Sequence, residues 1–237
     1  MNNKVITAIA VLALGVVLFW PAGSSKKVEN LYKEGEALYT KKDYEGAIGK
    51  YEAALDEAEK PMVKTEVIDK DFYTLAKFKI AVCYSKMAED TGDLNHYGTA
   101  TEIIEEIFPN AVVPRHMEGL TYLWANVLYK QEQYELAEPK FMELVENFPN
   151  SQFVENAWYA MGQLNYKLQK YDETRQAFKE VLDGFPNSDF KDDAQHLIAQ
   201  SFLDEENYEQ AYQEFDKLAT EEFKNYADLQ AEAMYKA

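Results

Sequence analysis

The stretch FPNSQFVENAWYAMGQ at residues 148–163 decides the fold, because FPNSDFKDDAQHLIAQ at residues 185–200 repeats it. The two stretches begin 37 residues apart. A fixed period of about 20 to 50 residues indicates an array of repeated units. A second amphipathic stretch follows each of them after a short polar turn, for example YDETRQAFKEVLDG at residues 171–184. Apolar side chains recur at i, i+3, i+4 and i+7 in both halves, which predicts two helices in each unit.

The same pattern extends, less regularly, over residues 28–237. Proline or a polar cluster separates the units, and no stretch alternates with period two for long, so no strands are expected. The predicted fold class is all-α, with the second unit carrying a longer turn at residues 89–98. About five helical hairpins and a terminal helix are expected, at residues 28–61, 74–109, 118–149, 155–186, 192–222 and 225–237.

Two positions in each unit predict how the helices pack. The first helix carries a small residue that lets its partner approach closely. These small residues are Gly35, Ala81, Ala125, Gly162 and Ala199. The second helix carries a large residue that fills the seam to the next pair. These large residues are Tyr51, Ile104, Phe141, Phe178 and Phe215.

On these residues the units resemble the tetratricopeptide repeat (TPR), written W-x2-L-G-x2-Y, then A-x3-F, then P. The fourth unit matches it with Trp158, Gly162, Phe178 and Pro186. The FPNS linkage and the spacing of 37 residues resemble the periplasmic branch of the family, of the Tol-Pal coordinator and outer-membrane assembly lipoprotein D type. The resemblance implies a right-handed superhelix, or solenoid, that binds protein, and it leaves the partner open.

Residues 1–27 differ from the rest of the chain. Lys4 precedes an uncharged apolar run at residues 5–20, which Pro21 and small residues follow. A helix of this run would reach about 24 Å, short of the hydrocarbon core of about 30 Å. A retained N-terminal membrane anchor and a cleaved signal peptide therefore both stay open. Either one predicts a periplasmic location, in a bacterial cell envelope, for residues 28–237.

The charge balance excludes some partners. The chain of 237 residues carries 24 Lys and Arg against 42 Asp and Glu, a formal net charge of −18. Nucleic acid is not expected as a partner, because its phosphates are bound by cations. Residues 189–237 hold 13 of the acids and only four lysines, which predicts that this end attracts a basic protein partner. Cys83 is the single cysteine, so no internal disulfide can form.

The sequence carries no motif typical of an enzyme. It lacks G-x-x-x-x-G-K-[ST], G-x-G-x-x-G and H-E-x-x-H. The three histidines are 20 and 80 residues apart, and the paired glutamates are adjacent, so that they point to different sides of a helix. We therefore predict no catalytic residue, no metal and no cofactor, and a protein that is not an enzyme.

The candidate binding surface is the inner wall of the array, which the first helices of such hairpins form. Residues at i, i+4 and i+7 on these helices are expected to face the groove. Tyrosine offers rigid contact area, and Asn or Gln can bond a peptide backbone as donor and acceptor. The predicted groove residues are Tyr32, Tyr39, Phe78, Tyr122, Asn126, Tyr129, Tyr159, Gln163, Tyr166, His196 and Gln200.

These observations predict a non-enzymatic scaffold or adaptor that binds a partner protein or peptide in its groove. It could serve as an assembly subunit of a membrane-associated complex, held at the membrane if residues 1–27 are uncleaved. The alternative is a self-associating structural protein, a homo-oligomer in which terminal repeats pack between copies.

Overall fold

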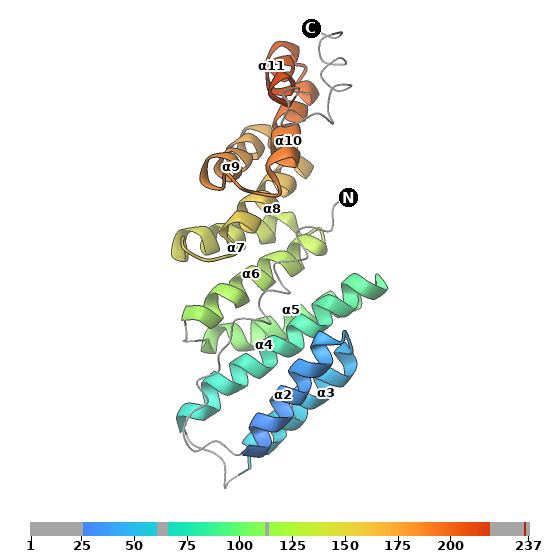
Figure 1. The fold of residues 1–237 in the computed structure, drawn as a ribbon, viewed down its shortest axis with the longest axis vertical. Coiled ribbons are helices and arrows are strands. Elements are labelled where there is room, and N and C mark those ends of the chain that lie inside the picture. Colours follow the sequence, from blue (N-terminus) through green and yellow to red (C-terminus); the bar gives the residue numbers. More distant parts are fainter. Residues whose placement is uncertain (1–25, 61–65, 112–113, 219–234, 236–237) are drawn as a thin grey trace. The chain divides into compact units, whose positions relative to one another are not determined.

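The computed structural model describes residues 26–60, 66–111, 114–218 and 235, and all regular elements in these ranges are helical (Figure 1). The chain divides into two compact units, residues 1–140 and 141–237. None of the helices in the described ranges combines the length and the apolar character needed to cross a membrane. Most of the predicted segment 1–27 and of the predicted terminal helix 225–237 lies outside the described residues.

Unit 1 contains two helical hairpins and the beginning of a third. The short 3-10 turn η2 (Phe108–Asn110) follows the second hairpin. The boundary between the units falls after residue 140, within the second helix of the third hairpin. The helices of this part are α2 (Lys26–Thr40), α3 (Tyr44–Ala58), α4 (Glu66–Thr91), α5 (Asn95–Ile107), α6 (Pro114–Lys130) and α7 (Tyr134–Asn147).

Unit 2 continues with two more hairpins, drawn in yellow to red in Figure 1. Their helices are α8 (Val154–Lys167), α9 (Tyr171–Gly184), α10 (Lys191–Asp204) and α11 (Tyr208–Leu218). The ten helices of the described ranges thus form five successive pairs, which confirms the predicted all-α fold of helical hairpins.

The second hairpin differs from the prediction. Helix α4 begins at Glu66 rather than at residue 74 and runs to Thr91, and α5 begins at Asn95, so the predicted long turn at residues 89–98 is wrong. The additional residues extend the helices instead. Gly92 ends α4 with a φ of 75°, a conformation that glycine adopts without steric cost. Asp93 then accepts a hydrogen bond of 3.0 Å from the Asn95 N–H.

Glycines on two first helices lie directly against aromatic rings of the second helices. A β-carbon at Gly35 would lie 2.7 Å from Tyr51 Cε1, and one at Gly162 would lie 2.6 Å from Phe178 Cε1. Both distances are shorter than real Cβ contacts, so a larger residue would displace the ring. The predicted close approach is confirmed at these two positions. All five predicted seam residues, Tyr51, Ile104, Phe141, Phe178 and Phe215, are fully buried.

One turn geometry closes four of the hairpins. A residue with left-handed backbone ends the first helix, and the N–H of the next residue bonds to a carbonyl five positions back, as in a Schellman motif. Gln133 donates in this way to the Leu128 carbonyl at 3.0 Å, and Lys170 to the Asn165 carbonyl at 2.9 Å. The left-handed residues, with φ between 57° and 63°, are Lys42, Glu132, Gln169 and Glu206. None of them is glycine, so each turn retains backbone strain.

Replacing Gly162 by alanine should destabilise the protein, because the added methyl group meets the buried ring of Phe178. Overpacking of this kind costs about 1–3 kcal/mol, which outweighs the helix propensity that alanine gains. Gly49→Ala is the matched control, since nothing lies within 4 Å of its β-carbon position, and it should stabilise α3 by about 0.5–1 kcal/mol. Urea unfolding followed by circular dichroism measures both. Equal changes in the free energy of unfolding of the two variants would contradict the close approach of Gly162 to the Phe178 ring.

Replacing Glu132 by glycine should raise the free energy of unfolding by about 0.5–1 kcal/mol, because glycine adopts the left-handed turn without strain. Glu135→Gly is the control, since Glu135 lies in the first turn of α7, where glycine should cost a similar amount. The midpoint temperatures of thermal unfolding of the two variants should therefore shift in opposite directions. A decrease for both would show that the turn stores no strain.

Candidate protein-interaction surface

Four of the predicted groove residues in unit 1 are buried. Their side chains cannot meet a partner in this structure, so the prediction that they line an open groove is corrected. These residues are Tyr32, Phe78, Tyr122 and Asn126, with exposed fractions of 0 to 5%. Tyr32 illustrates the cause, because its ring centroid lies 5.3 Å from that of Tyr51 and 6.0 Å from that of Phe72. The second helix of its own hairpin and the next hairpin close over it.

Tyr39 and Tyr129 are the predicted groove residues of unit 1 that stay half-buried. Each pairs with the first tyrosine of the following helix, at centroid distances of 5.6 Å for Tyr39 and Tyr44 and 5.7 Å for Tyr129 and Tyr134. Burial, with a smaller contribution from Tyr134, raises the pKa of Tyr129 to about 12. Both tyrosines therefore offer neutral rings and hydroxyl groups at the hairpin turns.

A partly buried ion pair lies next to Tyr39. Lys79 Nζ donates to Glu36 Oε2 at 3.0 Å, and the Tyr51 hydroxyl also donates to this carboxylate. The Lys79 ammonium lies 6.0 Å from the ring centroid of Tyr39, within range of a cation–π contact. The pair joins the first hairpin to α4 and balances its own charge. Reasoning from the sequence missed Lys79, whose only signal was a lysine within the apolar stretch LAKFKIAV at residues 75–82.

In unit 2 the predicted residue Tyr159 is buried as well, which again corrects the prediction. Its ring stacks on Phe190 at a centroid distance of 4.3 Å and an interplanar angle of 16°. Phe190 belongs to the linkage that repeats FPNS, and it closes over α8 just before α10 begins. The aromatic residue thus joins successive hairpins instead of contacting a partner.

The other predicted residues of unit 2 form a half-buried polar face on α8 and α10. They are Gln163, Tyr166, His196 and Gln200. The Tyr166 hydroxyl donates to Asp204 Oδ2 at 2.5 Å, and Gln200 Nε2 donates to Asp204 Oδ1 at 2.8 Å. Both donors are neutral, so these bonds orient the Asp204 carboxylate without cancelling its negative charge. Asp204 was not among the predicted groove residues. The only sequence feature that marks it is the run of three acidic residues, 204–206, that it begins.

The pKa values of Tyr166 and His196 are shifted in the directions that favour their neutral forms. Burial, followed by the hydrogen bond to Asp204, raises the pKa of Tyr166 above its ordinary value. Burial lowers the pKa of His196, although the nearby charge of Asp193 opposes this shift. The polar face, defined as Gln163, Tyr166, His196, Gln200 and Asp204, therefore surrounds the exposed Asp204 carboxylate with side chains that favour their neutral forms.

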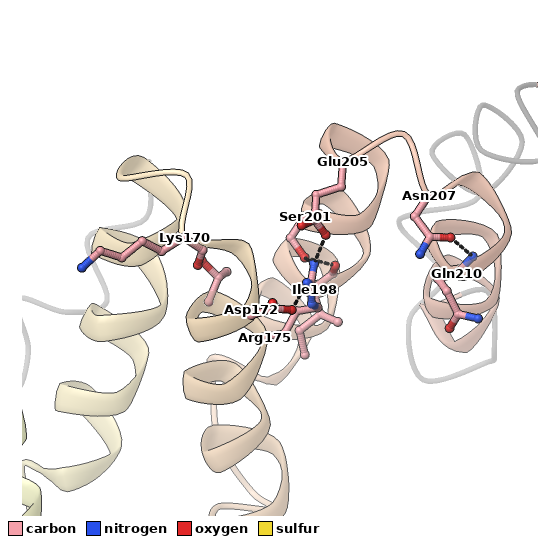
Figure 2. A network of polar contacts seen from close by, with 9 residues as sticks. Lys170, Asp172, Arg175, Ile198, Ser201, Glu205, Asn207 and Gln210 are labelled. Carbon is pink, nitrogen blue, oxygen red and sulfur yellow. Dashed lines mark hydrogen bonds and ion pairs between the residues drawn. The ribbon is translucent and has the colours of Figure 1, made fainter.

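Arg175 fixes α10 against α9 (Figure 2). Its Nη1 donates to Glu205 Oε2 at 2.6 Å and to Ser201 Oγ at 3.1 Å, while Nη2 pairs with Asp172 on its own helix. The guanidinium carbon also lies 4.2 Å from the ring centroid of Phe202. These contacts hold the last turn of α10, which carries Asp204, in place.

Successive helical pairs joined by one turn geometry and by buried rings define the class of helical-repeat proteins. Within that class, residues 122–189 match the family model of the tetratricopeptide repeat. The described fold is that of TPR proteins, and these findings support that family for the chain. The resemblance to its periplasmic branch stays a prediction. A search of curated protein sequences gave no significant match.

Solved structures with the same fold are similar over most of the chain. MamA (residues 41 to end) from Desulfovibrio magneticus RS-1 has a TM-score of 0.65 at 14% identity, covering 86% of this chain and 98% of its own. YrrB, described as a TPR protein with an unusual peptide-binding site, has 0.59 at 20% identity, covering 87% and 88%. The apo form of RapI has 0.58 at 18% identity, covering 80% and 68%. At these identities the likeness establishes the fold alone.

Replacing Arg175 by alanine should lower the free energy of unfolding by about 1–3 kcal/mol, because Glu205 and Ser201 lose their donor and Phe202 loses its packing partner. Lys179→Ala is the control, since Lys179 is exposed on the same helix, and it should change stability by less than about 0.5 kcal/mol. Urea unfolding and hydrogen exchange of the α10 amides measure the effect. An Arg175 variant as stable as the control would show that the network does not fix α10.

Proposed function

We propose that the protein is a non-enzymatic scaffold that binds an extended segment of a partner protein on the polar face of α8 and α10. The observation that carries the proposal is the exposed Asp204 carboxylate, which neutral donors on two half-buried residues hold in place. Such a site is prepared before the partner arrives, so little ordering is required on binding. Gln163 and Gln200 can donate to and accept from a peptide backbone beside it.

The partner segment is proposed to be basic. Residues 141–218 carry 16 Asp and Glu against six Lys and Arg, so a cationic segment is attracted over a distance and then pairs with Asp204. Proteins with the TPR fold support protein or peptide binding in general terms, and YrrB is a TPR protein with an unusual peptide-binding site. The basic character of the partner rests on the charges of this chain.

The proposed setting is a bacterial cell envelope, where the scaffold would serve the assembly of a membrane-associated complex. Support comes from the sequence of residues 1–27, whose apolar run fits either a membrane anchor or a signal peptide. The intact mass of the protein in its native membrane fraction tells which of the two applies. The proposed binding face is the same in both cases.

The binding proposal is tested by selecting linear 12-residue peptides from a random display library on the full chain. The recovered peptides should share a Lys or Arg, and the dissociation constant of one of them should rise about tenfold in Asp204→Asn, a loss of about 1.4 kcal/mol. The affinity should also fall as salt is added. Fluorescence polarisation of the labelled peptide measures both effects.

Glu180→Gln is the matched control, because it removes one exposed carboxylate from α9 of the same unit, and it should change the affinity by less than twofold. Failure to recover any peptide, or equal affinities in the two variants, would contradict the proposal. Sedimentation velocity over a range of concentrations separates it from the alternative, self-association of the chain. A mass that rises with concentration, together with no bound peptide, would favour that alternative.

A further inference from the structure

Several buried polar side-chain atoms in unit 1 have no hydrogen-bond partner among the described residues. Ser85 Oγ, Glu89 Oε1 and Asn126 Oδ1 are among them. Ser85 is fully buried, and the exposed fractions of Asn126 and of the Glu89 side chain are 1% and 9%. In native proteins about nine in ten buried polar groups are partnered, by protein or by ordered water. The lack of a partner at these atoms therefore requires a physical explanation.

The three residues lie on α4 and α6, two helices that contact each other. Ser85 and Glu89 are one turn apart on α4 and share a face, and Asn126 follows Tyr122 by one turn on the same face of α6. The charge of Glu89 reaches the two helices that follow α4. It adds to burial, the main cause, in raising the pKa of Tyr122 on α6 and that of Tyr97 on α5. We call Ser85, Glu89 and Asn126 the polar seam.

The polar seam lacks donors rather than acceptors. Lys86 Nζ donates to Glu89 Oε2 at 2.7 Å, which leaves Oε1 without a donor. The Asn126 carbonyl oxygen can only accept, and the Ser85 hydroxyl group can supply one hydrogen at most. The ligand that completes such a set brings two donors in a small volume. A metal cation does not fit it well, because the Lys86 ammonium already lies against the same carboxylate.

We propose that the polar seam binds ordered water, with at least one molecule that donates to Glu89 Oε1 or Asn126 Oδ1 and bridges α4 to α6. Water donates two hydrogen bonds and accepts two, so it meets the needs of both acceptors and of the Ser85 hydroxyl. This inference goes beyond the proposed scaffold function and does not depend on it. In this proposal ordered water joins the second hairpin to α6. Buried aromatic rings, by contrast, join the first hairpin to α4.

The experiment counts long-lived water by oxygen-17 magnetic relaxation dispersion on the full chain, with water itself as the probe. Ser85→Ala and Asn126→Leu should each lower the count of long-lived water relative to the unmodified chain. Ser201→Ala is the matched control, because Ser201 is equally buried but accepts from Arg175 and donates to the Ile198 carbonyl. Its count should stay unchanged.

Counts that are the same in the unmodified chain, Ser85→Ala and Asn126→Leu would overturn the proposal. If a variant does not fold, a high-resolution crystal structure of the unmodified chain decides the question. Water within hydrogen-bond distance of Glu89 Oε1 or Asn126 Oδ1 supports the proposal, whereas a dry seam, a protein donor or a metal ion at these atoms overturns it.

Discussion

The contact between a small residue on the first helix and a buried ring on the second is the constraint on which the other features depend. At Gly162 the ring of Phe178 occupies the space that any side chain would take, and at Gly35 the ring of Tyr51 does the same. Burying such a ring stabilises the fold by roughly 1.5–3 kcal/mol, provided that the helices approach this closely. The close approach brings the two helices of a hairpin into register, and that register sets where their remaining side chains point.

Successive hairpins are then joined by seams of different chemistry. Aromatic rings and the Glu36–Lys79 pair join the first hairpin to α4. Arg175 joins α9 to α10 through charged and polar groups that stay partly exposed. A buried ion pair contributes less to stability than its geometry suggests, because both charges lose their hydration. The Glu36–Lys79 pair also orients α4 relative to the first hairpin, because Lys79 is partnered only where it reaches Glu36.

Periodicity predicted the five hairpins because the helix pattern depends on residues three and four positions apart, which a single sequence displays. The close approaches at Gly35 and Gly162 were predicted for the same reason. The turn at residues 89–98 was predicted wrongly, since its polar residues suit a loop and an exposed helix end equally well. Whether a helix face stays open depends on how the next hairpin packs, and Phe190 covers Tyr159 from 31 residues further along the chain. Asp204 escaped prediction because Tyr166, one of its two donors, lies 38 residues earlier in the chain and becomes its neighbour only after folding.

Packing of the repeats buries five of the eleven predicted groove residues. Tyr39 and Tyr166 occupy the same position in their hairpins, where each pairs with the first tyrosine of the next helix. Their surroundings nevertheless differ in charge. Beside Tyr39 the Lys79 ammonium is buried and neutralised by Glu36, whereas beside Tyr166 the Asp204 carboxylate accepts only from neutral donors. Burial removes Tyr32, Phe78, Tyr122, Asn126 and Tyr159 from contact with a partner. The proposed charge-dependent recognition is therefore assigned to the exposed Asp204 carboxylate.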